Sequence, residues 1–115
     1  MRDSRSYLWD VLEAATAIAR FVKDVDAEAY ESSEIIHSAV ERKFEIIGEA
    51  LNLLVKSDPD LAAKVSGFRQ MISFRNLLIH GYASVDHDRV WSIIKDDLPK
   101  LMDIVGTLLE ELDRG

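Results

Sequence analysis

The sequence has 115 residues, with 14 lysines and arginines against 21 aspartates and glutamates, and its formal net charge at neutral pH is −7. A protein that coats duplex DNA or bulk RNA over its whole surface is usually basic, so any contact with nucleic acid should be local, for instance in a cleft that gathers Arg69, Arg75 and Arg89. The chain has no cysteine, which excludes a disulfide framework and a thiolate zinc site.

Apolar residues recur at three- and four-residue steps along most of the chain, as they do in amphipathic helices. The first helix is predicted over about residues 4–24, and a connection rich in acidic and small residues follows as far as Ser33. Ser33, or Ser32 before it, is a good N-cap for the next helix. This second helix is predicted to run to about Val55, and as the longest helix it should form the spine of the fold.

Asp58 followed by Pro59 fits the N-cap and the first position of a helix and predicts a short helix that ends at Gly67. The next helix is predicted over about residues 68–80. Its apolar residues are unusually many for so short a segment. We therefore expect much of this helix to be buried, part of it against a second subunit.

Asp86 or Asp88 can cap a last helix that begins near Arg89. Pro99 lacks a backbone N–H and its ring clashes with the carbonyl of Lys95, so this helix should break or kink there before the helical pattern resumes. No segment alternates in the manner of a strand. The predicted fold class is therefore all-α, an antiparallel bundle of four to five helices with short loops.

No internal repeat or low-complexity segment divides the chain, and residues 1–115 are predicted to form a single domain whose modest core a dimer would help to stabilise. The first residues do not follow the pattern of a signal peptide, and no apolar run approaches the length of a membrane span. We therefore expect a cytoplasmic protein that makes no contact with a membrane.

The polar residues Arg75, Asn76, His80 and Tyr82 crowd together at the place where an apolar helix is predicted to end. At about 100° per residue, Asn76 and His80 lie roughly 40° apart on one helix face, and Arg75 is long enough to reach round to them. Gly81 should supply the left-handed position that commonly closes a helix. His80 then lies in the last turn, where the helix dipole favours the imidazolium and the charge can change near neutral pH. This segment is the candidate active site.

A metal site is the main alternative among the other polar residues. Glu34 and His37 have the spacing of one di-iron ligand pair, but that chemistry needs a second such pair, and the sequence has none. Glu41, Glu45 and Glu49 follow His37 at four-residue steps, which a solvated helix face explains better. A further interpretation is that Glu45 and Glu49 pair with arginines of a cleft. We expect no metal and no other cofactor.

A longer run of residues around the candidate site recurs in the order of a known family. The run comprises Arg75-Asn76, His80-Gly81-Tyr82, Val85-Asp86, Val90-Trp91 and Asp97-Leu98-Pro99, preceded by Glu45 to Ala50 and by Arg2-Asp3. With these residues the chain resembles the HepT-type proteins of the HEPN superfamily, which are the toxins of MntA–HepT toxin–antitoxin pairs.

The resemblance implies a metal-independent endoribonuclease toxin of a type VII toxin–antitoxin system, which works as a homodimer with both copies of Arg75 and His80 in one cleft. His80 would serve as base or acid, Arg75 would stabilise the charged phosphorane, and Asn76 would support the imidazole or contact phosphate. The resemblance also implies an MntA-like nucleotidyltransferase antitoxin, which silences the toxin by transferring AMP to Tyr82.

Each of these residues also has a structural interpretation. His80 could bond the last carbonyls of its helix, Arg75 could form an interface salt bridge, and Tyr82 could pack its ring on the core. Asn76 could complete hydrogen bonds of the turn. For the whole chain, the alternatives are a non-catalytic helical partner that binds and regulates a nucleotidyltransferase, and a dimeric bundle without an enzymatic role.

Overall fold

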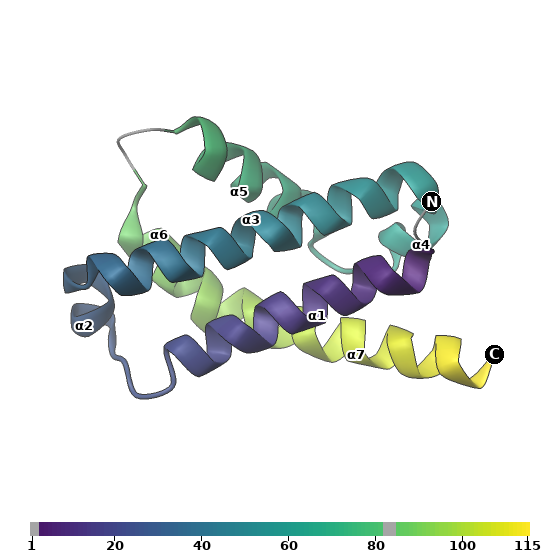
Figure 1. Cartoon of the computed structure of the whole chain (residues 1–115), viewed down its shortest axis with the longest axis horizontal. Helices are drawn as coiled ribbons and strands as arrows, with labels where there is room; N and C mark the ends of the chain where they lie inside the picture. Colours follow the sequence, from purple (N-terminus) through teal and green to yellow (C-terminus); the bar gives the residue numbers. More distant parts are fainter. Residues whose placement is uncertain (1–2, 82–84) are drawn as a thin grey trace.

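The computed structural model describes residues 3–81 and 85–115, and within these ranges its only regular structure is helical, which confirms the predicted all-α class. Four long helices build the bundle. They are α1 (Ser4–Phe21), α3 (Glu34–Ser57), α5 (Phe68–His80) and α7 (Leu98–Arg114). As Figure 1 shows, α3 lies in the middle, with α5 on one side and α1 on the other, and α7 packs against α1.

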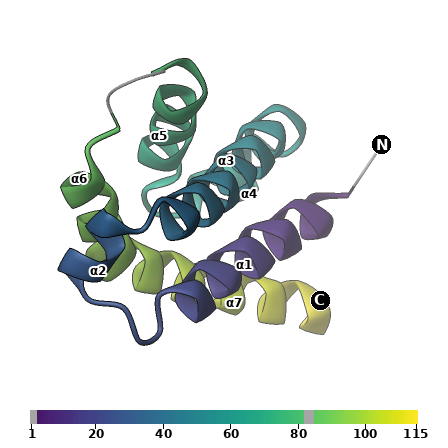
Figure 2. The same cartoon turned by 60° about the vertical axis from the view of Figure 1, so that its left-hand side comes forward.

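Shorter segments connect the long helices. They are α2 (Ala27–Ser32), α4 (Pro59–Ala63), α6 (His87–Ser92) and a π-helical turn, η1 (Ile93–Asp97), which leads directly into α7. Helices α2 and α6 lie together at the end of the bundle opposite the two termini (Figures 1 and 2). None of the helices in the described part of the chain is long and apolar enough to cross a membrane.

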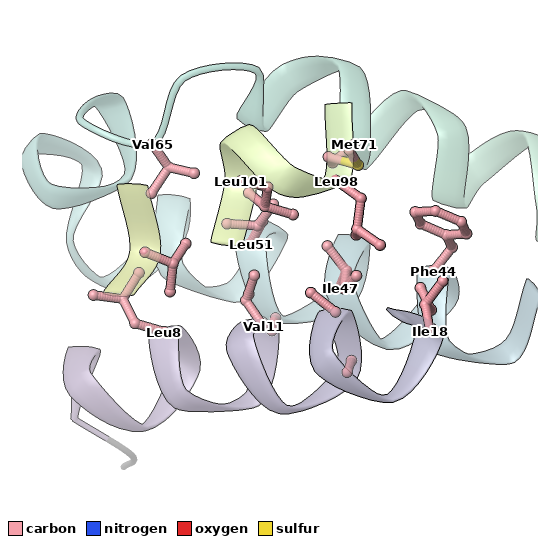
Figure 3. Packing of buried hydrophobic residues seen from close by; sticks show 14 of the residues in the cluster. Leu8, Val11, Ile18, Phe44, Ile47, Leu51, Val65, Met71, Leu98 and Leu101 are labelled. Atoms are coloured by element: carbon pink, nitrogen blue, oxygen red, sulfur yellow. The ribbon is translucent and has the colours of Figure 1, made fainter. Parts of the chain in front are cut away.

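The core forms where the apolar stripes of α1, α3 and α7 meet. Figure 3 shows Leu8, Val11 and Ile18 of α1 turned toward α3, and these three side chains are fully buried. The ring of Phe44 on α3 packs edge to face against Phe74 on α5, with 5.2 Å between the ring centroids. Helix α3 is therefore held from both sides, and it provides a rigid support for the residues of the candidate site.

The predicted starts of α3 and α4 are both confirmed. The Ser33 hydroxyl accepts a hydrogen bond from the Ile36 N–H at 3.2 Å and caps α3. The Asp58 carboxylate accepts one from the Leu61 N–H at 3.2 Å, with Pro59 at the start of α4. Side-chain oxygens satisfy helix N–H groups that have no partner within the helix, which explains why these residue types begin helices.

The first predicted helix and the connection after it were partly wrong. Helix α1 ends earlier than predicted, at Phe21, and the presumed connection contains the short helix α2. Asp26 caps α2 by accepting from the Ala29 N–H at 2.8 Å. The Tyr30 side chain is fully buried and attaches α2 to the bundle. A single buried aromatic residue gives no periodic pattern. The acidic and small residues around it suggested a connection, so the helix was not predicted.

Asp86 caps α6 as predicted, by accepting from the Asp88 and Arg89 N–H groups, although α6 begins at His87, slightly before the predicted start near Arg89. At the predicted break or kink near Pro99, the α-helix is interrupted by a π-helical turn without a break in the helical path. The chain widens into η1, in which the Leu98 N–H bonds to the Ile93 carbonyl. Pro99 is the second residue of α7 and, without an N–H, cannot donate to a carbonyl of the preceding turn. A wide π-turn before the proline thus keeps the helical path continuous.

Helix α5 has the predicted bounds but not the predicted burial. Only Met71 and Phe74 are buried, and Leu77 and Ile79 are 41% and 37% exposed. The reason is that α5 lies at the edge of the bundle and packs mainly against α3. Leu77 and Ile79 are two positions apart, so they lie on opposite flanks of α5 and not on one face.

Gly81 ends α5 in a different way from the one predicted. Its φ and ψ are −92° and 42°, outside the left-handed region, and its N–H bonds to the Leu77 carbonyl at 2.7 Å. A Cβ at this position would lie 2.6 Å from that carbonyl oxygen. Glycine is required here by the close approach to Leu77, not by a positive φ.

Candidate active site

The candidate site is built where α5 crosses α3 at a glycine. A Cβ placed on Gly48 would lie 2.1 Å from the Arg75 Cβ and 3.0 Å from the Met71 carbonyl oxygen. Contacts this short cannot be accommodated without moving one of the helices. Gly48 therefore permits the close crossing that sets the position of Arg75. The sequence reasoning missed this role, for which the only signal was a glycine inside a strongly predicted helix.

The Arg75 guanidinium is fixed by two neighbouring side chains. Its Nη2 forms an ion pair with Glu49 Oε2 at 2.5 Å, and its Nη1 donates to the Asn76 amide oxygen at 3.0 Å. The Arg75 side chain is only 25% exposed. Because arginine carries five N–H donors, these two contacts orient the group and leave other donors for a ligand. The predicted pairing of Glu49 with a cleft arginine is confirmed.

Arg75 opens onto a pocket of about 220 Å³ between α1, α3 and α5. The pocket is lined by charged and apolar residues, namely Asp10, Arg42, Glu45, Ile46, Glu49, Ala50, Leu53, Arg75 and Ile79. Arg42 is the second cation, and it pairs with Glu45 at 3.4 Å, which confirms the other predicted glutamate pair. The suggested partners Arg69 and Arg89 are absent from this lining. Sequence reasoning missed Arg42 because it lies on another helix, α3.

His80 lies one turn beyond Asn76 on α5 and is not bonded to the Arg75 cluster. It is exposed in the last turn of α5, and among the described residues no hydrogen bond or ion pair connects it to Arg75 or Asn76. Asn76 contacts the arginine and does not orient the imidazole. The fourth predicted residue, Tyr82, lies outside the described residues. A single chain thus joins Arg75 and Asn76 by a hydrogen bond and places His80 one turn further along the same helix, without a bond to either among the described residues.

The acidic ridge of α3 is not a simple solvated face, contrary to expectation. Next to the paired Glu45 and Glu49, Glu41 is partly buried, and this burial raises the pKa of its carboxyl, while His87 and His37 act in the opposite direction. His37 stacks on His87 with 3.6 Å between the ring centroids. Within residues 3–81 and 85–115, no group of three histidine, aspartate or glutamate side chains is placed to hold a metal ion.

An all-α bundle with Arg75 and His80 on one helix beside a charged pocket has the organisation of a HEPN-superfamily protein. Residues 11–108 match the model of the family described as "Ribonuclease HepT-like". The chain therefore belongs to the HepT-like ribonuclease family, as its resemblance to HepT-type proteins indicated.

Named relatives support this assignment. The chain is 36% identical over 100 residues to a Methanocaldococcus jannaschii protein named "Putative RNase MJ1380", a match that covers 87% of this chain and 91% of that protein. It is 33% identical over 100 residues to the "Probable ribonuclease HepT" of Thermococcus cleftensis, with 87% of this chain and 90% of that protein covered. No solved structure matches the chain significantly.

Proposed function

We propose that this protein is a metal-independent endoribonuclease in which Arg75 and His80 carry the reaction. The observation that supports this most directly is the Arg75 guanidinium, which is held at the mouth of a pocket by Glu49 and Asn76 in a chain of the HepT-like ribonuclease family. A planar guanidinium with free donors matches the oxygens of a phosphate group.

In the proposed reaction a base removes the proton of a ribose 2′-hydroxyl, and the 2′ oxygen attacks the adjacent phosphorus. The bond from phosphorus to the 5′ oxygen then breaks, and an acid gives that oxygen a proton. The products are a 2′,3′-cyclic phosphate and a 5′-hydroxyl. His80 supplies the base and acid functions, and Arg75 stabilises the extra negative charge on the phosphorane.

We propose further that the active form is a homodimer. His80 and Arg75 do not contact each other within the described part of one chain, and one histidine cannot be base and acid in the same step. Leu77 is 41% exposed on the flank of α5 away from the pocket that Ile79 lines, and a second copy would cover it. Such a dimer would place two copies of each catalytic residue in one cleft.

The test is cleavage of a mixed single-stranded and transfer RNA pool in excess chelator, with analysis of the product ends. Wild type should leave cyclic phosphates, whereas Arg75→Ala and His80→Ala should each lower the rate by at least about 100-fold. Arg69→Ala is the matched control, because Arg69 is an exposed arginine of the same helix whose side chain lies 5.3 Å from the Phe68 ring. Equal loss in Arg69→Ala, or full activity in His80→Ala, would refute the assignment.

Regulation by an MntA-like nucleotidyltransferase antitoxin that transfers AMP to Tyr82 is the second part of the proposal. The chain has three tyrosines, and Tyr7 and Tyr30 are 8% and 0% exposed, so neither is a ready acceptor in the folded protein. Incubation with such a transferase and ATP should add one AMP mass to wild type and none to Tyr82→Phe. A mass shift that persists in Tyr82→Phe would contradict the choice of acceptor.

If unmodified wild type cleaves no RNA but still binds the transferase, the alternative function gains support. In that case the chain would be a non-catalytic helical partner that regulates a nucleotidyltransferase. The pairing of both pocket arginines with glutamates is the observation that favours this alternative.

A further inference from the structure

Arg42 is a charged residue of the pocket that the proposed reaction does not use. It lies on α3 and lines the same pocket as Arg75. Its side chain is 68% exposed, and its described ion pair is with Glu45. Because a guanidinium carries five N–H donors and no acceptor, a guanidinium that lines a pocket suits a ligand with negatively charged oxygens.

The two arginines of the pocket are held about one helical turn apart. Arg42 is paired with Glu45 on α3. Arg75 is paired with Glu49, which lies four residues further along the same helix. Side chains at this spacing share one face of a helix, with about 5–6 Å between their Cβ atoms. Neighbouring phosphates of a single RNA strand can therefore reach both guanidiniums at once.

The ion pair with Glu45 leaves Arg42 able to bind a phosphate. The two side chains are three residues apart on α3, and their contact is an exposed hydrogen bond of 3.4 Å. Exposed pairs of this kind contribute little stability, whereas a phosphate can accept two aligned hydrogen bonds from a guanidinium. Arg42 can thus turn toward a ligand, while the Glu49 oxygen that contacts Arg75 is inaccessible to solvent.

We propose that Arg42 binds the phosphate next to the scissile one, so that the pocket holds two neighbouring phosphates of one RNA strand. Arg75 contacts the scissile phosphate, and the nucleotide between the two phosphates lies against the apolar side chain of Ile46, which lines the pocket on the same helix. The position of this contact relative to the scissile bond rests on the proposed ribonuclease function. The binding of an RNA phosphate by Arg42 does not.

The carboxylates of the pocket oppose phosphate binding. The described lining contains Asp10, Glu45 and Glu49 against two arginines, so a phosphate is attracted only where a guanidinium donates to it directly. A phosphate on Arg42 would lie beside the Glu45 carboxylate, and the two negative charges would repel each other. Removal of the charge on Glu45 should therefore strengthen RNA binding, whereas removal of Arg42 should weaken it.

The first measurement is binding of a short single-stranded RNA that carries a 2′-O-methyl group on every ribose and cannot be cleaved. Fluorescence anisotropy at several salt concentrations gives Kd and its salt dependence. Arg42→Ala should raise Kd about tenfold. It should also reduce the slope of log Kd against log salt by about 0.7, the value for one phosphate contact on a single strand. Glu45→Gln should lower Kd.

Two controls separate a phosphate contact from a general effect of charge. Arg69→Ala removes an exposed arginine that is absent from the pocket lining, and it should bind RNA as wild type does. Arg42→Ala combined with Glu45→Gln should still bind about tenfold more weakly than Glu45→Gln alone. The loss then comes from the missing guanidinium and not from an unpaired Glu45.

The second measurement places the contact on the strand. The substrate is the same RNA with one unmodified ribose, so that a single bond can be cleaved, and a neutral methylphosphonate replaces each of the two phosphates that flank the scissile one in turn. At one flanking position the replacement should lower kcat/KM about tenfold in wild type and less than about twofold in Arg42→Ala.

The outcomes separate this inference from the ribonuclease proposal. Unchanged Kd and salt slope in Arg42→Ala, an equal loss in Arg69→Ala, or additive losses from the methylphosphonate and Arg42→Ala would overturn the role of Arg42 even if RNA is cleaved. Binding that depends on Arg42 in a wild-type protein that cleaves no RNA would support the phosphate contact and overturn the ribonuclease proposal.

Discussion

Replacement of Gly48 by alanine tests the close crossing of α3 and α5, and Gly106→Ala is its control. Both glycines lie inside long helices, where alanine is intrinsically better than glycine by about 0.5–1 kcal/mol. A Cβ at Gly106 would meet no atom within 4 Å, whereas one at Gly48 would lie 2.1 Å from the Arg75 Cβ. The two substitutions therefore bring the same gain in helix propensity, but only Gly48→Ala introduces a steric clash.

These contacts determine whether each substitution raises or lowers the free energy of unfolding. The atoms that a Cβ on Gly48 would meet are the root of Arg75 and the backbone oxygen of Met71, neither of which can swing aside. Overpacking of a tight site costs about 1–3 kcal/mol, and here the upper part of that range applies. Gly48→Ala should thus lose about 2 kcal/mol after the gain in propensity. Gly106→Ala should gain about 0.5–1 kcal/mol.

Thermal unfolding measures both effects. At about 4 °C per kcal/mol for a domain of this size, the Tm values of the two variants should differ by roughly 10 °C, with wild type between them. Protomer concentration must be the same in all samples, because dimerisation would make Tm depend on it. A Gly48→Ala protein as stable as wild type would show that the helices do not cross as closely as described.

Two further predictions concern single carboxylates. Asp58→Ala should lower the free energy of unfolding in urea by about 1–2 kcal/mol, because Asp58 caps α4 and also accepts from the Ser4 hydroxyl at 2.9 Å. The control is Asp60→Ala, which replaces an exposed neighbour and should change the stability little. Equal losses in the two variants would contradict the role of Asp58 as a cap. For Glu41→Gln the expected effect depends on pH. Burial raises the pKa of Glu41 above its ordinary value of 4.5, so wild type is favoured by this group at low pH and loses that stability as pH rises through the folded-state pKa. The stability of Glu41→Gln relative to wild type should therefore increase as pH rises through this range. A stability difference between the two proteins that does not change with pH would contradict the prediction.

Much of the fold was predictable because local signals and tertiary packing agree. The caps at Ser33 and Asp58 and the bounds of α5 follow from residue types whose side chains or apolar spacing act within a few residues. The exposure of Leu77 could not be predicted in the same way. Burial of an apolar residue depends on how many neighbours its helix has, and periodicity indicates only which residues share a face.

Arg75 and His80 were proposed as site residues because they lie close together in the sequence, and their surroundings could not be predicted in this way. The contacts that fix Arg75 come from α3, and only the structure shows that Glu49 and Gly48 meet it there. The same limit applies to His37 and His87, which lie far apart in the sequence and whose stacking no local pattern indicates.

The net negative charge of the chain is compatible with the proposed reaction because of how the arginines are held. Glu49 Oε2 contacts one nitrogen of Arg75 without the alignment of a hydrogen bond, and the Glu49 side chain is 45% exposed. The contacting oxygen itself is inaccessible to solvent. A phosphate can accept two aligned hydrogen bonds from the same guanidinium, so it would offer Arg75 a better-aligned partner than this single contact. In the free protein, Glu49 and Asn76 hold the guanidinium of Arg75 beside the pocket.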